Sequence, residues 1–82
     1  MKVLKFTAPW CGPCQLMNEQ LKNFTAFPIE EYNVDEAFDE VEKYNVSSVP
    51  TLVFEKDGEV VHTHKGTITP SKLEQLCKNL NQ

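Results

Sequence analysis

Residues 6–17 read FTAPWCGPCQLM, and within this stretch the chain changes from a strand pattern to a helix pattern. The preceding residues 2–7, KVLKFT, form a short β-prone run that ends at Ala8-Pro9, which predicts a strand. From Cys14 onward, apolar side chains recur at helical spacing. They predict a helix that begins inside the cysteine motif and ends at about Phe24: Leu16, Met17, Leu21 and Phe24. Both cysteines of the motif are therefore expected at a helix N-terminus.

The middle of the chain repeats this alternation. Residues 29–33 predict a second strand, and the segment DEAFDEVEKYNV, residues 35–46, predicts a second helix. Asp35 is the expected N-cap of that helix, and Phe38 and Val41 are expected on one face of it.

The C-terminal part of the chain predicts a hairpin and a closing helix. After Pro50, two runs rich in β-branched and aromatic residues flank Lys56-Asp57-Gly58, a short turn in which glycine can adopt positive φ. Thr69-Pro70-Ser71 is typical of a helix start. The helix that follows carries apolar side chains on one face: Leu73, Leu76, Cys77 and Leu80.

The predicted order of elements, β-α-β-α-β-β-α, defines the fold class. A strand, a helix and a strand at the start imply a parallel pair, and the later hairpin adds antiparallel partners. We therefore expect an α/β fold with a mixed four-stranded sheet and helices on both faces, built as one domain over residues 1–82. The cysteine motif would follow the carboxyl end of the first strand, where ligands usually bind in α/β sheets.

Composition excludes several classes of protein. The chain has 82 residues, of which 40% are hydrophobic and 24% charged, as in ordinary globular domains. The net charge is −4 without a Lys/Arg cluster, which argues against nucleic acid and anionic membrane surfaces as partners. The N-terminus does not resemble a signal peptide, and no apolar run approaches the ~20 residues of a membrane span. We expect a cytoplasmic protein.

Acidic residues are concentrated in one part of the chain. Between Glu30 and Glu42 there are seven carboxylates and no lysine or arginine. A run of this kind is usually a solvated surface, here the exposed face of the second helix and the segment that leads to it.

The two motif cysteines suit thiol–disulfide exchange. Three cysteines are an odd number, which argues against a framework of structural bridges. At a helix N-terminus, free N–H groups and the helix dipole favour an anion, so the pKa of Cys11 should lie below the ~8.5 of a free thiol. Gly12 permits close backbone approach and Pro13 suits an early helical position. Cys11 could attack a substrate disulfide, and Cys14 could then release the substrate by attacking Cys11.

A metal site is the alternative use of a Cys-x-x-Cys pair. Such a pair supplies half of a tetrahedral zinc or iron–sulfur site. The remaining candidate ligands are Cys77, His62 and His64, and they do not form a second closely spaced pair. We therefore expect no metal and no bound cofactor, because two thiols can carry the electrons themselves.

Three stretches together resemble the thioredoxin family. APWCGPC (8–14) resembles its active-site segment, VSSVPTLVFEKDGEVV (46–61) its cis-proline loop and hairpin, and HKG (64–66) its substrate-facing glycine turn. The resemblance covers nearly the whole chain, but the strand and helix that precede the active-site strand in ordinary thioredoxins are missing. The chain is thus similar to a minimal, glutaredoxin-sized member of the family.

The resemblance implies roles for individual residues. Cys11 would be the attacking thiol and Cys14 the resolving thiol of a redox-active disulfide. Pro50 would follow a cis peptide bond and lie opposite the cysteines. A flat apolar rim would receive the substrate, and it would consist of Trp10, Val49 and Gly66 together with Pro50.

Lys5 departs from the family pattern, because ordinary thioredoxins carry a buried aspartate six residues before the first cysteine. Two interpretations of Lys5 remain open. Its ammonium could extend toward the cysteines and stabilise a thiolate, or it could reach solvent past the edge of the sheet. Cys77, on the apolar face of the last helix, is expected to be a buried, inert thiol, with a regulatory or resolving thiol as the alternative.

The sequence therefore predicts a protein-disulfide reductase that acts as a monomer on disulfide-containing proteins and receives electrons from a thioredoxin reductase or from glutathione. Two alternatives stay open. One is a glutaredoxin-like, glutathione-dependent reductase. The other is a docking module that uses the same face to bind a larger enzyme, with redox activity incidental.

Overall fold

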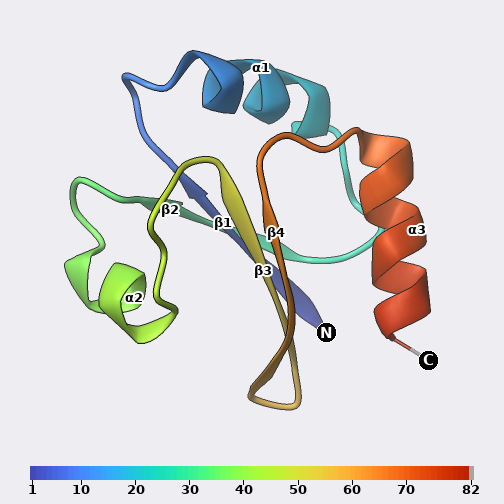
Figure 1. Ribbon diagram of the computed structural model, residues 1–82. Coiled ribbons are helices and arrows are strands. Elements are labelled where there is room, and N and C mark those ends of the chain that lie inside the picture. The colour runs from blue at the N-terminus through green and yellow to red at the C-terminus, as the bar shows by residue number, and fades with distance from the viewer. Residues whose placement is uncertain (82) are drawn as a thin grey trace.

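The computed structural model describes residues 1–81, and the elements in this range follow the predicted order (Figure 1). They are β1 (Lys2–Thr7), α1 (Gly12–Leu21), β2 (Ile29–Asn33), α2 (Phe38–Lys43), β3 (Thr51–Lys56), β4 (Glu59–Lys65) and α3 (Pro70–Leu80).

The four strands form one mixed sheet in the order β2-β1-β3-β4. β1 runs parallel to β2 and antiparallel to β3, and β3 runs antiparallel to β4. The β3–β4 turn has positive φ at Gly58, as the sequence predicted for a tight hairpin, and also at Asp57. The predicted sheet is confirmed, and β1 lies in its interior with the cysteine motif directly after it.

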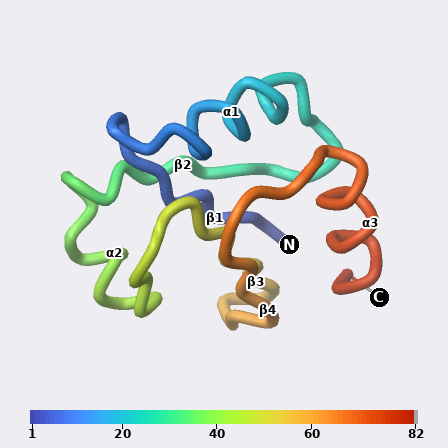
Figure 2. Tube along the Cα trace, turned by 45° about the horizontal axis from the view of Figure 1, so that its top comes forward, coloured from blue at the N-terminus to red at the C-terminus, as the bar shows by residue number. Residues whose placement is uncertain are grey.

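The helices cover both faces of the sheet, which also confirms the prediction. Side chains of α1 and α3 pack on one face, whereas α2 and the segments around it pack on the other. Figure 2 shows α2 and α3 on opposite sides of the strands. The first core contains Val3, Leu52, Phe54, Met17, Leu21, Ile68, Leu73 and Cys77, and the second contains Leu4, Phe6 and Val53.

The start of α2 differs from the prediction. Its N-cap is Ala37 and no side chain caps it, so the expectation that Asp35 is the N-cap is wrong. Asp35 instead belongs to a turn, because its backbone N–H donates to the side-chain oxygen of Asn33 at 2.9 Å. That turn delays the helix and leaves the Asp35 carboxylate available for another partner.

The late start also changes the apolar face of α2. Phe38 and Val41 are expected on one face of the helix, but Phe38 is the first helical residue and is 70% exposed. Only Val41 packs against the core.

The ends of α1 were also predicted approximately. The helix ends at Leu21, and Phe24 packs against the core from the turn that follows. Met17 and Leu21 are buried as expected, whereas Leu16 is exposed. α3 agrees with the prediction: Thr69 is its N-cap and accepts a hydrogen bond from the Lys72 N–H. Among residues 1–81, no helix has both the length and the apolar character needed to cross a membrane.

Candidate active site

The two motif cysteines form a disulfide at the N-terminus of α1. Cys11 and Cys14 are bonded, with their Cα atoms 5.2 Å apart. Cys11 is the N-cap of α1, and its Sγ accepts a hydrogen bond from the Cys14 backbone N–H at 3.1 Å. Gly12 and Pro13 occupy the first two helical positions, where the missing N–H of proline has no intrahelical partner to lose. In the reduced state the same N–H and the helix dipole would face a Cys11 thiolate.

The two sulfurs differ in accessibility. Cys11 is 6% exposed and Cys14 is fully buried, and the two form a buried cluster with Ala8, against which Val34 and Val49 pack. A substrate can therefore reach Cys11 more readily than Cys14.

Trp10 projects from the loop before the disulfide and is 68% exposed. Its indole N–H donates to both carboxylate oxygens of Asp35, at 3.0 and 3.3 Å. Asp35 follows β2, and parallel pairing brings the carboxyl ends of β1 and β2 to the same edge of the sheet. This position was the signal that could have assigned Asp35 to the site rather than to a helix cap.

The loop before β3 lies beside the disulfide. The Val49–Pro50 peptide bond is cis, as the resemblance implies. The Thr51 hydroxyl donates to the Ser48 carbonyl at 2.7 Å, and the Gly66 N–H donates to the Pro50 carbonyl at 2.9 Å. Gly66 has φ +98, which a glycine adopts without strain. The structure thus brings together Pro50 and Gly66, which are 16 residues apart in the sequence.

An apolar groove of about 240 Å³ adjoins the disulfide. Its walls contain two of the predicted substrate-binding residues, Trp10 and Val49. The other five lining residues are not among the site residues predicted from the sequence: Val34, Val41, Val46, Ser47 and Ser48. Val34 and Val49 also pack against the buried cluster of Ala8, Cys11 and Cys14, so the groove lies next to the disulfide, although its lining contains neither cysteine.

Lys5 lies on the same face of the sheet as α1, and only 10% of its side chain is exposed. Most of the Lys5 side chain is therefore shielded from solvent, and Lys5 lines a surface hollow together with Glu31 of the edge strand β2. Its Nζ is 3.8 Å from Oε1 of Glu31, which is the partner of Lys5 in the β1–β2 register. The same carboxylate oxygen accepts a hydrogen bond from the Thr7 hydroxyl at 3.4 Å. Lys5 thus forms an ion pair beneath α1.

The remaining cysteine and histidines lie apart from the disulfide. Cys77 is fully buried in the core under α3, and burial raises the pKa of its thiol to about 11. His62 contacts the Phe54 ring, and Nε2 of His64 is 3.0 Å from the Thr67 carbonyl oxygen. In the part of the chain that the structure describes, His, Cys, Asp and Glu side chains form no group of three or more that could hold a metal.

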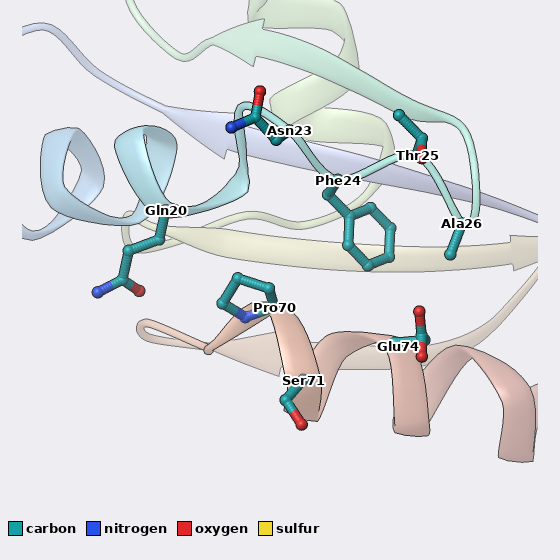
Figure 3. Close-up of a pocket in the computed structure, with 8 residues that line it drawn as sticks. All are labelled: Gln20, Asn23, Phe24, Thr25, Ala26, Pro70, Ser71 and Glu74. Carbon is teal, nitrogen blue, oxygen red and sulfur yellow. The ribbon is translucent and has the colours of Figure 1, made fainter.

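A second hollow, of about 450 Å³, lies between the segment after α1 and the start of α3 (Figure 3). Figure 3 shows the Phe24 ring between these two segments. The lining contains no cysteine and no predicted site residue: Gln20, Asn23, Phe24, Thr25, Ala26, Pro70, Ser71 and Glu74. Val34 and Val49 of the groove pack against the cluster that contains Cys11 and Cys14, whereas no residue that lines this hollow belongs to that cluster or packs against it.

Comparison with known proteins agrees with this geometry. The family model described as Thioredoxin matches residues 1–79. A thioredoxin of Bacillus subtilis is 40% identical over 76 residues, which are 87% of this chain and 73% of that protein. A thioredoxin of Chlamydia pneumoniae is 41% identical over 63 residues, which are 72% of this chain and 62% of that protein.

Solved structures give the same result. The germline-specific thioredoxin Deadhead of Drosophila melanogaster superimposes with a TM-score of 0.84 at 30% identity, covering 96% of this chain and 79% of that one. The Cys11–Cys14 disulfide therefore lies in the fold in which thioredoxins carry their dithiol/disulfide pair. The chain belongs to the thioredoxin family.

Proposed function

We propose that this chain reduces disulfide bonds in proteins by thiol–disulfide exchange. The observation that carries the proposal is the Cys11–Cys14 disulfide at the N-terminus of α1, next to an apolar groove whose residues Val34 and Val49 pack against the cluster that contains both cysteines. A pair that can both open and close, next to a surface fitted for an apolar segment, suits transfer of two electrons to a bound substrate.

Cys11 is assigned the attack and Cys14 the resolution. The Cys11 thiolate attacks one sulfur of the substrate disulfide, forms a mixed disulfide and releases the other substrate sulfur as a thiolate. Deprotonated Cys14 then attacks Sγ of Cys11, closes the Cys11–Cys14 bond and releases the second substrate thiolate. The substrate gains two electrons and two protons, and the protein loses both. The greater exposure of Cys11 and its position as N-cap support this order.

The surroundings are assigned supporting roles. Trp10, Val49, Pro50 and Gly66 would form the surface that receives the substrate, and the groove beside Trp10 and Val49 would accept one of its apolar side chains. Gly12 and Pro13, which are exposed at the start of α1, leave space for the substrate chain next to Cys11.

Lys5 is assigned a supporting electrostatic role. Its ammonium lies beneath α1 and should favour thiolate over thiol, although Glu31 neutralises part of its effect. We expect the thiol pKa of the reduced protein to increase from wild type to Lys5→Met to Lys5→Asp, measured by thiolate absorbance. An unchanged thiol pKa in all three proteins would show that Lys5 has no electrostatic role at the cysteines.

The setting of the reaction is also a proposal. We propose that residues 1–82 act as a single domain and a monomer in the cytoplasm, where thiols are kept reduced. The electron donor would be a thioredoxin reductase, with glutathione as the alternative donor.

The experiment offers the oxidised protein two reducing systems, NADPH with a thioredoxin reductase and NADPH with glutathione and its reductase, and uses insulin as the disulfide substrate. We expect NADPH oxidation that depends on this protein, with the faster rate in the first system. A faster rate with glutathione would favour the glutaredoxin-like alternative. Absence of turnover in both systems, with the protein folded, would favour the docking module.

A further inference from the structure

We propose that the groove beside the disulfide selects substrates whose reactive cysteine is flanked by lysine or arginine. This inference rests on the proposed function and adds the chemistry of the substrate segment that the groove would bind. It follows from the distribution of charge around the apolar groove.

One wall of the groove belongs to an acidic segment. Val34 and Val41 contribute to this wall, and every charged residue between them is a carboxylate. Figure 2 shows this segment, from the end of β2 through α2, on the side of the sheet away from α3. Its carboxylates, with the one directly after Val41, are Asp35, Glu36, Asp39, Glu40 and Glu42.

These carboxylates keep their charge unneutralised by the protein. Within residues 1–81 none of the five forms an ion pair, in contrast to Glu19 and Glu74, which pair with Lys22 and Lys78. Asp35 accepts its hydrogen bonds from the indole of Trp10, which carries no charge. The segment that contributes Val34 and Val41 to the groove is therefore negatively charged, and the Asp35 carboxylate is held beside Trp10 in the groove wall.

The opposite wall contains no positive charge to oppose this field. It consists of residues 46–49, Val-Ser-Ser-Val. Two lysines on the neighbouring strands, Lys2 and Lys5, are paired with carboxylates of their own. Lys43, at the end of α2, lies over the ring of Tyr44, 5.2 Å from its centroid.

The two features together define the partner. An apolar groove next to the disulfide fits one apolar side chain of an extended segment, and the acidic segment beside the groove attracts cations next to that side chain. A cleft lined by one sign of charge raises the local concentration and association rate of oppositely charged ligands, by a factor of 10 or more. A substrate with aspartate or glutamate at the same positions would be repelled.

The test uses three disulfide-bonded peptides that share a valine next to the cysteine and differ only in the two flanking residues, which are lysine, glutamine or glutamate. Reduction is measured as kcat/KM with the reduced full-length protein at low ionic strength. We expect the order lysine, glutamine, glutamate, with about a tenfold difference between the first and the last. The difference should nearly vanish in 1 M NaCl, where the Debye length is about 3 Å.

Matched variants locate the effect. Glu36→Gln with Asp39→Asn neutralises two carboxylates of the acidic segment, neither of which lines the groove or belongs to the catalytic machinery, and should reduce the preference for the lysine peptide about threefold. Glu59→Gln with Glu74→Gln changes the net charge equally on β4 and α3 and should leave the preference unchanged.

Equal rates for the three peptides, or equal effects of the two double variants, would overturn the inference while leaving the proposed function intact. If none of the peptides is reduced, the proposed function and the inference both fail.

Discussion

The ion pair beneath α1 allows a sharp prediction about stability. Only 10% of the Lys5 side chain is exposed, against 56% of its partner Glu31. In Glu31→Gln the amide keeps an oxygen for the Thr7 hydroxyl, but the ammonium of Lys5 stays buried without a counter-charge. Breaking a fully buried pair in this way costs about 3–5 kcal/mol, whereas a surface pair is worth about 0–1 kcal/mol.

Because Glu31 is half exposed, we expect an intermediate loss of about 1–2 kcal/mol in the free energy of unfolding. With a urea dependence of about 1 kcal/mol/M for a domain of this size, the midpoint should decrease by about 1–2 M. The measurement is urea unfolding of the oxidised protein, followed by far-ultraviolet circular dichroism. The matched control is Glu30→Gln. Glu30 lies next to Glu31 on β2, and its exposed carboxylate pairs with Lys2 of β1, so its replacement should cost less than about 0.5 kcal/mol of unfolding free energy.

A second pair of variants separates a buried charge from a lost contact. Lys5→Met removes the buried ammonium and keeps the side-chain volume, so it should leave stability nearly unchanged. In that background Glu31→Gln should cost nothing further. The reasoning is refuted if Glu31→Gln is as stable as Glu30→Gln, or if Lys5→Met costs more than Glu31→Gln.

Three further predictions concern the site and the core. Cys11→Ser should abolish reduction, while Cys14→Ser should still attack once and retain the substrate as a mixed disulfide, visible by mass spectrometry; equal loss of adducts in both variants would contradict the assigned roles. Asp35→Ala should raise KM about fivefold and leave kcat nearly unchanged, because a hydrogen bond worth about 1 kcal/mol orients Trp10, and an unchanged KM would contradict this. The pKa of Cys77 is raised from 9.0 to about 11 in the folded protein, so the unfolded thiol ionises first and stability should decrease by roughly 2–3 kcal/mol between pH 9 and 11. Cys77→Ala should lose less stability over the same range in urea titrations, and parallel losses in both proteins would show that other groups dominate.

The sequence was sufficient for the order of the elements, because each one carries its own period and its own boundary signals. The helix period continues through Leu73 and Cys77, and both are buried. The hairpin is marked by Asp57-Gly58, which take the positive φ values that the turn requires. Cys11 and Cys14 predicted thiol–disulfide chemistry because they lie close together in the sequence and do not depend on contacts between distant segments.

The details that failed depend on contacts between segments. A carboxylate after a strand can cap a helix or accept a distant hydrogen bond, and only the packing of the two loops shows that Asp35 serves Trp10. The partner of Lys5 depends on the register of β1 and β2, which the sequence pattern leaves open. The groove could not be predicted for the same reason, because its lining comes from four separate segments that share no sequence pattern.

The buried Cys77 thiol can be used as a probe of the transient separation of α3 from the sheet. The thiol is fully enclosed between α3 and the sheet, so an alkylating reagent cannot reach it until α3 separates from the strands. In the oxidised protein the other two cysteines are bonded and silent toward such a reagent. The rate of alkylation would therefore report how often α3 detaches from the sheet under native conditions, which a bulk melting curve does not measure. A substrate bound in the groove should leave this rate nearly unchanged, because the groove lies beside α2 and α3 lies on the other face of the sheet.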